Sequence, residues 1–168
     1  MKYAITGFLF LALAGCAATA QSYKIYNLYA YGRQFIPGNI PVEEGADDKP
    51  ARHTFIYTVY IETNSSQLPQ ITAAWIDKVS HHATPFAIPD NTVVAGKDQK
   101  NGRPVTIRPA KGRWLYKVEF HPPDTARKLP AGYQNTSVGK ILLQMRVNKK
   151  TEYMLTRPIA MLEPEEMY

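Results

Sequence analysis

Two adjacent histidines, His81 and His82, are the side chains in this sequence best suited to metal or proton chemistry. Histidine is the commonest metal ligand in proteins and titrates near neutral pH. Adjacent side chains of an extended chain point to opposite faces, so both rings reach one metal ion only in a turn, and a site needs three or four ligands. We therefore expect a polar loop end between Ser80 and Ala83. Metal binding by His81 and His82 is the weaker hypothesis, and we expect no cofactor.

Carboxylates offer another route to catalysis. Three of them fall near the ends of expected strands, but their spacing does not pair them for acid–base work: Asp77, Glu119 and Asp124. An acidic run lacks the alternating ligands of an EF-hand loop and reads as a solvated loop: Glu43, Glu44, Asp47 and Asp48. The sequence has no G-x-S-x-G, H-E-x-x-H, C-x-x-C or phosphate-loop motif. We assign no catalytic residue, and a metal-dependent or carboxylate-based hydrolase ranks third among the readings.

The strongest charge feature is a basic stretch over residues 97–117. It holds seven Lys or Arg residues against a single acid, Asp98, in a chain with 20 Lys+Arg and 14 Asp+Glu. If these cations share one face, their potential attracts phosphates or uronic acids, as in lipopolysaccharide, lipid headgroups and acidic glycans. The other reading is a set of solvated loops whose charges guard sheet edges. The candidate anion-binding residues are Lys97, Lys100, Arg103, Arg108, Lys111, Arg113 and Lys117.

The first 20 residues have the three parts of a secretory signal peptide. Lys2 gives a positive start, and the apolar run of ten residues over 4–13 is shorter than a membrane span, which needs about 20. Ala18-Thr19-Ala20 fits the small-x-small cleavage rule. Cleavage there would release a soluble protein that begins at Gln21.

A second cleavage site overlaps the first. Leu13-Ala14-Gly15-Cys16 follows the apolar run directly and resembles the lipobox of bacterial lipoproteins. The resemblance implies that Cys16 takes a diacylglycerol and becomes the first residue of the mature protein. It also implies an outer-membrane destination, because the residue after the cysteine is Ala17 and not an aspartate. We favour this anchor, which several acyl chains make effectively permanent.

Residues 21–168 read as one domain of typical size, about 150 residues. Cys16 is the only cysteine, so an exported domain of this length must be held together by its hydrophobic core and not by disulfides.

Alternating apolar and polar residues predict strands along the whole domain. The clearest is residues 53–63, where Val59 and Ile61 fall on the core face and Glu62 on the other. Residues 113–121 repeat the pattern and place Trp114 on the core face.

A hairpin is predicted near the C-terminus. Residues 140–148 and 151–162 both alternate, and Lys149-Lys150 between them forms the expected turn. In this reading Tyr153 and Leu155 point into the core. Weaker strands are expected at 23–31, 71–78, 92–95 and 104–108, and long loops at 32–52 and 121–139.

Seven or eight short strands without helical crossovers predict an all-β fold, an antiparallel β-sandwich. Trp75 on the third strand gives the domain a loose resemblance to immunoglobulin-like domains, which bury a tryptophan there. The cysteine pair of antibody domains is missing.

The function expected from these features is that of a non-enzymatic cell-envelope lipoprotein, an accessory module for other envelope proteins. The alternative is a module that binds an anionic glycan, lipopolysaccharide or lipid headgroup through residues 97–117. Export argues against a nucleic-acid partner.

Overall fold

The computed structural model describes residues 22–36, 54–124, 127–135 and 138–166. These residues form ten strands and no helix: β1 Ile25–Ile36, β2 Thr54–Thr63, β3 Gln70–Ile76, β4 Val79–Ala87, β5 Val93–Lys97, β6 Pro104–Ile107, β7 Trp114–Pro123, β8 Ile141–Val147, β9 Lys150–Leu155 and β10 Ala160–Glu166. The all-β prediction is confirmed. Within the described part of the chain, no helix has the length and apolarity to cross a membrane.

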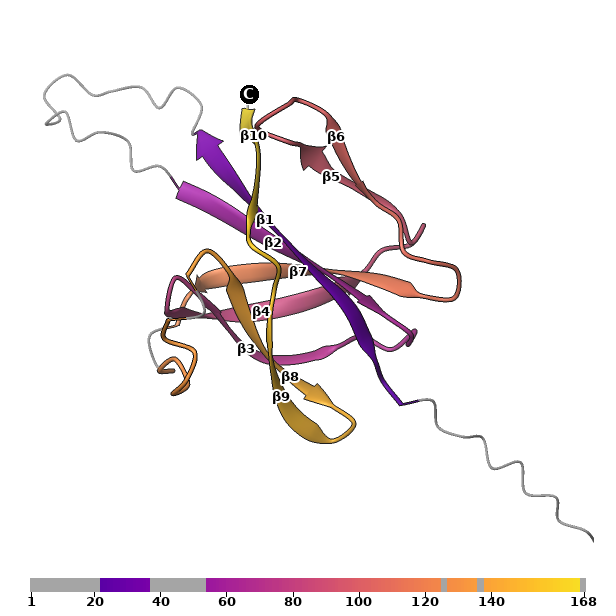
Figure 1. The fold of residues 1–168 in the computed structure, drawn as a ribbon, viewed down its shortest axis with the longest axis vertical. Helices are drawn as coiled ribbons and strands as arrows, with labels where there is room; N and C mark the ends of the chain where they lie inside the picture. Colours follow the sequence, from indigo (N-terminus) through magenta and orange to yellow (C-terminus); the bar gives the residue numbers. More distant parts are fainter. Residues whose placement is uncertain (1–21, 37–53, 125–126, 136–137, 167–168) are drawn as a thin grey trace, which may run out of the picture.

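Eight strands form one curled sheet in the order β10-β1-β2-β7-β4-β3-β8-β9 (Figure 1). Its halves β1-β2-β7-β4 and β3-β8-β9 have the A-B-E-D and C-F-G strand orders of immunoglobulin constant-type domains. A separate hairpin, β5-β6, is inserted between the strands that correspond to D and E. Only the pairing of β1 with β10 is parallel among the described ladders, and it makes the sheet mixed.

The main core lies between the two halves of the sheet. Its fully buried members include Val59 from β2, Val118 from β7 and Leu143 from β8. At about 25 cal/mol per Å² of buried apolar surface, such side chains stabilise a domain that cannot form an internal disulfide, because the chain has one cysteine. Val59 and Ile61 lie on the core face, as the alternation predicts.

The β8–β9 hairpin is confirmed, but its turn and its faces differ from the prediction. The turn residues are Asn148 and Lys149, whose φ angles of 49° and 65° are typical of a type I′ turn. Because Val147 pairs with Lys150, an odd-numbered core position on β8 lies opposite an even-numbered one on β9. Met154 therefore packs on the core, and the prediction that Tyr153 and Leu155 do so is wrong.

The predicted long strand 151–162 is two strands. The chain leaves β9 at Leu155 and crosses to the other side of the sheet, where β10 pairs with the C-terminal half of β1. Pro158 lies in this crossover and has no N–H to give to a ladder.

Strand β4 contains both histidines, so the prediction of a loop end at His81 and His82 is wrong. Asp77 and Lys78 form a tight turn with φ angles of 47° and 71°, and the chain returns beside β3. β4 pairs with a strand on each side but buries only Ser80 fully. Its polar residues and Pro85 therefore show no alternation of apolar and polar residues in the sequence.

A second apolar layer covers the outer face of β1, β2 and β7. There β5-β6 packs on Tyr31, Tyr60 and Leu115. The prediction that Trp114 faces the core is wrong: its side chain is 47% exposed, and Leu115 is the buried neighbour.

A third small cluster encloses Trp75. Leu129 and Tyr133, from the loop after β7, pack over Trp75 and Leu142 on the outer face of β3 and β8. Trp75 is buried on the strand that corresponds to C, as expected, but on the opposite face from the central core.

Candidate functional site

The basic stretch 97–117 does not form one surface. Lys97, Lys100 and Arg103 surround the β5-β6 turn, whose backbone is bonded to β10 through Gln99 N–H and Met161 O at 3.1 Å. The others follow β6, which is about 10–13 Å long at 3.3 Å per residue. Arg108 and Lys111 are exposed there, at the far end of the hairpin.

Two of the seven candidate cations are held by carboxylates of this chain. Arg113 Nη1 lies 2.8 Å from Glu62 Oε1, and Lys117 Nζ lies 2.6 Å from Glu119 Oε1. The seven cations thus do not share one face, and two of them are already paired with carboxylates. Both findings weaken the anion-binding hypothesis for this stretch.

The histidines of β4 and β7 have separate contacts. His81 Nδ1 lies 2.9 Å from the carbonyl oxygen of His121, and His82 Nε2 lies 3.3 Å from Asp124 Oδ2. His121 Nε2 lies 2.8 Å from Thr84 Oγ1. Over the described residues, no three His, Cys, Asp or Glu side chains are arranged to hold a metal ion.

The three carboxylates near strand ends have different neighbours. Asp77 is exposed in the β3–β4 turn, Glu119 pairs with Lys117, and Asp124 contacts His82. Cys16, the leader 1–20 and the acidic residues Glu43, Glu44, Asp47 and Asp48 lie outside the described residues.

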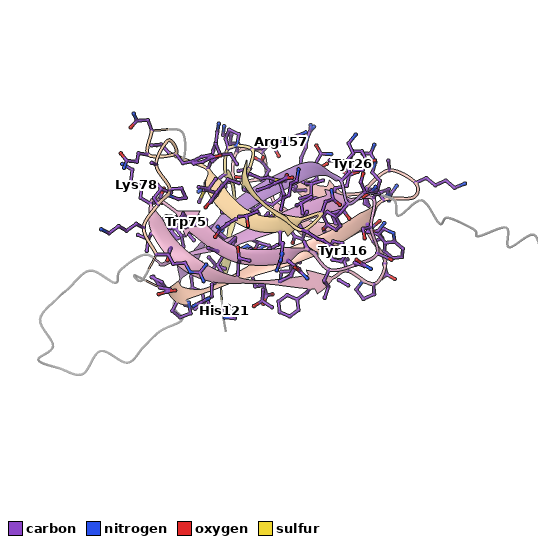
Figure 2. All side chains as sticks on the ribbon, turned by 90° about the horizontal axis from the view of Figure 1, so that it is seen from below. Tyr26, Trp75, Lys78, Tyr116, His121 and Arg157 are labelled. Atoms are coloured by element: carbon purple, nitrogen blue, oxygen red, sulfur yellow. The ribbon has the colours of Figure 1, made fainter. Side chains whose placement is uncertain are left out.

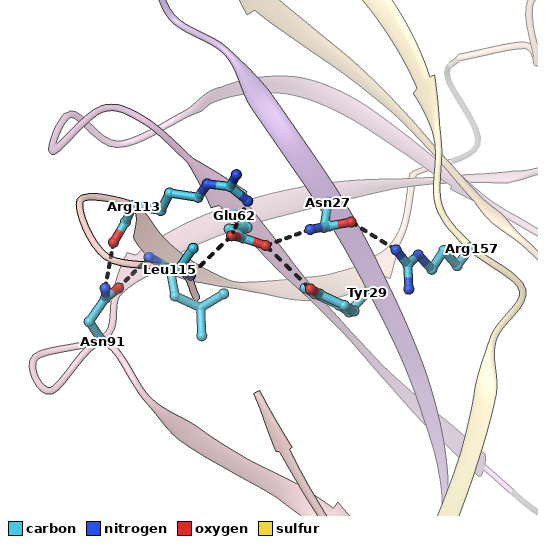
Figure 3. Close-up of polar contacts among 8 residues, drawn as sticks. Asn27, Tyr29, Glu62, Asn91, Arg113, Leu115 and Arg157 are labelled. Carbon is cyan, nitrogen blue, oxygen red and sulfur yellow. Dashed lines mark hydrogen bonds and ion pairs between the residues drawn. The ribbon is translucent and has the colours of Figure 1, made fainter. Parts of the chain in front are cut away.

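The buried carboxylate of Glu62 organises the region beside β1, although alternation predicts that it lies on the outer face of its strand (Figure 3). Glu62 is 2% exposed and accepts hydrogen bonds from Asn27 Nδ2 at 2.6 Å and Arg113 Nη1 at 2.8 Å. The Tyr29 hydroxyl lies 3.3 Å from Oε2, and the Ala110 N–H donates to Oε1 at 3.4 Å. No sequence signal identifies this site, because its donors come from two segments far from Glu62 in the chain, β1 and the loop before β7.

The Glu62 carboxylate is tuned to stay ionised. Burial raises the pKa of Glu62, but the hydrogen bonds from Asn27, Arg113 and Ala110 outweigh burial and hold the pKa below its ordinary value. A carboxylate with its lone pairs occupied and a lowered pKa is a poor proton donor or base near pH 7. It serves here as a structural counter-charge.

Two cations and two aromatic rings extend this network outward. The Arg113 guanidinium lies 3.7 Å from the centre of the Tyr26 ring, and Arg157 lies 5.3 Å from that of Tyr29. Arg157 Nη2 also donates to Asn27 Oδ1 at 2.8 Å. Tyr26 and Arg157 lie on one side of the molecule, and His121 lies on the opposite side (Figure 2).

Beside this network the curled sheet stays open. β10 pairs with β1 only from Tyr31 onward, so the first half of β1 has no strand on that side among the described residues, and β9 ends the sheet at its other end. A groove of about 460 Å³ lies between these two strands; it is lined by Ile25, Tyr26, Asn27, Leu28, Met154, Leu155 and Arg157. We call it the seam.

Backbone groups of both strands point into the seam. The Arg157 N–H donates to Leu28 O at 3.2 Å. This bond closes one end of the seam and shows that the backbone carbonyl of Leu28 points away from β2. The Thr156 N–H donates to Ile141 O at 2.9 Å, so even-numbered residues of β9 face β8. By alternation, the N–H and C=O of Thr151, Tyr153 and Leu155 face the other way.

Comparison with protein-family models, curated proteins and solved structures finds no match to this chain. The immunoglobulin-like description therefore rests on strand order.

Proposed function

We propose that this protein is a non-enzymatic accessory module of the bacterial cell envelope that binds an extended segment of another envelope protein by strand addition at the seam. The observation that carries the proposal is a pair of edges, the first half of β1 and β9, on either side of one groove; among the described residues no further strand pairs with either edge. An added strand satisfies backbone donors and acceptors at such an edge and places alternate side chains in the groove.

The lining of the seam supports this reading. Leu28 and Met154 belong to or pack on the main core, so an inserted strand gains apolar contacts at the base of the groove. Asn27 and Arg157 supply polar groups at its rim. A sheet edge presents backbone donors and acceptors to a further strand and so favours association with another chain.

The alternative function is recognition of an anionic glycan or lipid. Its predicted surface, residues 97–117, is divided between the two ends of β5-β6, and Arg113 and Lys117 are paired. The divided surface supports the anion-binding function less well than the seam supports strand addition.

Crosslinking in intact envelopes tests the proposal. A photoreactive residue at Thr151, an exposed position on the free edge of β9, should capture a discrete partner. The same residue at Val94, which is 61% exposed on the separate β5-β6 hairpin, should not. Capture from Val94 and none from Thr151 would contradict strand addition.

A pair of proline substitutions separates binding from folding. Thr151→Pro removes an N–H that faces the seam, whereas Glu152→Pro removes one that bonds β8. We expect Thr151→Pro to keep the melting temperature within a few degrees and to lose the captured partner. Glu152→Pro should unfold more easily, and full capture by Thr151→Pro would count against the proposal.

A further inference from the structure

The first described residues of the chain are clamped to one end of the domain. The Tyr23 N–H donates to Asn148 Oδ1 at 3.0 Å, and Asn148 Nδ2 donates to Tyr23 O at 3.2 Å. Asn64 acts in the same way: its Oδ1 accepts the Lys24 N–H at 2.8 Å and its Nδ2 donates to Ser22 O at 3.0 Å. The chain therefore enters the domain at a fixed place, beside the β8–β9 turn.

Positive charge gathers at this end. Lys149 and Lys150 follow Asn148 directly in the β8–β9 hairpin, and Arg146 precedes it on β8. Lys24 adjoins the clamped Tyr23. All four are exposed, and we call them the basic cap: Lys24, Arg146, Lys149 and Lys150.

The surroundings of the basic cap leave its charges largely uncompensated. A groove of about 390 Å³ between Arg146, Lys149 and Tyr23 is otherwise lined by uncharged residues, namely Gln67, Leu68, Gln70 and Asn148. The salt bridges found among the described residues lie elsewhere and use none of the four cap cations. Leu68, 51% exposed, adds an apolar side chain to this surface.

We propose that the basic cap binds the anionic headgroups of the membrane that holds the anchor. This inference rests on the proposed function, a module of the cell envelope, and on the lipid anchor that the sequence predicts at Cys16. The six residues that follow Cys16, up to Ser22, can span at most about 20 Å, so the end that carries Ser22 cannot move far from the bilayer. Each Lys or Arg close to an anionic surface strengthens binding about fivefold.

Headgroup binding also orients the binding groove. The seam starts at Ile25, next to the basic cap, and runs along β1 and β9 away from it. The hairpin β5-β6 and the C-terminal end of β10 lie at the opposite end of the molecule (Figure 1). A domain seated on its basic cap therefore holds the seam upright above the lipid, where a partner strand has free access.

Vesicle binding by the lipid-free form tests the inference. A chain that begins at Gln21 keeps every described strand, so headgroup affinity can be measured without the anchor. We expect it to sediment with vesicles in which phosphatidylglycerol makes up a third of the lipid and to stay in solution with pure phosphatidylcholine. Binding should fall steeply with added salt.

Two double variants in the basic cap and one control elsewhere isolate its contribution. Lys149→Gln with Lys150→Gln should weaken binding to the anionic vesicles roughly 30-fold, from two charges worth about fivefold each. Lys97→Gln with Lys100→Gln makes the same charge change at the opposite end and should weaken it by less than about twofold, since those charges lie beyond the screening length. Lys24→Gln with Arg146→Gln should reproduce the first loss without touching the turn, and unchanged circular dichroism confirms folding.

The outcomes separate the two proposals. Equal losses from both ends, or binding to neutral vesicles, would overturn the basic cap. Release by millimolar inorganic phosphate at constant ionic strength would also overturn it, because it would indicate a discrete phosphate site. A native N-terminus at Gln21 with intact vesicle binding would refute the anchor and leave the cap standing.

Discussion

Glu62 on β2 and Arg113 before β7 are joined by an ion pair of 2.8 Å, and the same guanidinium lies 3.7 Å from the centre of the Tyr26 ring on β1. One arginine thus ties three segments together at the point where the curled sheet opens. Asn91 extends the tie, because its Nδ2 donates to Arg113 O and its Oδ1 accepts the Leu115 N–H at 2.6 Å (Figure 3).

Glu62→Gln should lower the free energy of unfolding at pH 7 by about 2–3 kcal/mol, because the Arg113 guanidinium loses its charged partner. The folded-state pKa of Glu62 lies below its ordinary value of 4.5, so its contribution is complete above that pH and is lost as the pH falls through the folded-state value. Urea unfolding between pH 7 and pH 3 should therefore show a shallower acid loss in the variant.

Glu119→Gln is the matched control for Glu62→Gln. Its pair with Lys117 is exposed, and its loss should cost less than about 1 kcal/mol. Equal costs for the two variants would contradict the structural role of the buried pair.

Gly96→Ala should destabilise the attachment of β5-β6 to the sheet. A Cβ at this position would lie 2.5 Å from Arg33 Nη2, which donates to Ala95 O at 2.9 Å, and 3.1 Å from Leu162 Cδ1. Backbone strain adds to this, because the φ of Gly96 is +148°. We expect a loss of about 2–3 kcal/mol in thermal or urea unfolding.

Gly112→Ala separates the contact from the strain. Gly112 also has a positive φ, +78°, but no atom lies within 4 Å of the place that a Cβ would occupy. It should cost only about 1–2 kcal/mol. A Gly112→Ala cost as large as that of Gly96→Ala would mean that the Arg33 contact is unimportant.

The two residues of the β8–β9 turn should respond in opposite directions to glycine. Lys149 has a φ of 65°, which a side chain disfavours, so Lys149→Gly should stabilise the protein by about 0.5–1 kcal/mol. Asn148→Gly suits the turn equally well but removes both hydrogen bonds to Tyr23 and should destabilise it. Chemical unfolding of both variants checks the sign, and a stabilising Asn148→Gly would show that the clamp contributes little.

The two tryptophans should report on different layers. Trp75 is 3% exposed beneath Leu129 and Tyr133, whereas Trp114 is 47% exposed. Trp114→Phe should leave blue-shifted fluorescence that iodide hardly quenches, and Trp75→Phe should leave red-shifted, quenchable emission. If Trp75 proved to be the quenchable tryptophan and Trp114 the protected one, the burial of these two side chains on β3 and β7 would be wrong.

Cys16→Ser should convert a membrane-bound protein into one that is released in aqueous buffer. The measurement is membrane fractionation together with the mass of the N-terminal peptide. In the wild-type protein this peptide should carry a diacylglycerol on Cys16. Recovery of that protein with Gln21 as its first residue would show that the signal-peptidase site is used instead.

The sequence by itself determined the all-β class and the positions of most strands, because side chains of a strand alternate between two faces whatever its neighbours are. It also determined that Val59 and Ile61 are core residues. It did not reveal β4, whose histidines and proline carry no alternating pattern.

Only the tertiary structure decided which polar residues meet. In the sequence Glu62 is expected to face solvent, but the loop before β7 covers it with Arg113. The sequence leaves open whether the cations of residues 97–117 share one face, and β5-β6 separates them. Lys24 and Lys149 are far apart in the chain, yet Asn148 brings them to one end of the domain. The physical reason is that alternation is a local property of the backbone, whereas burial and charge clustering depend on which strands the sheet pairs together.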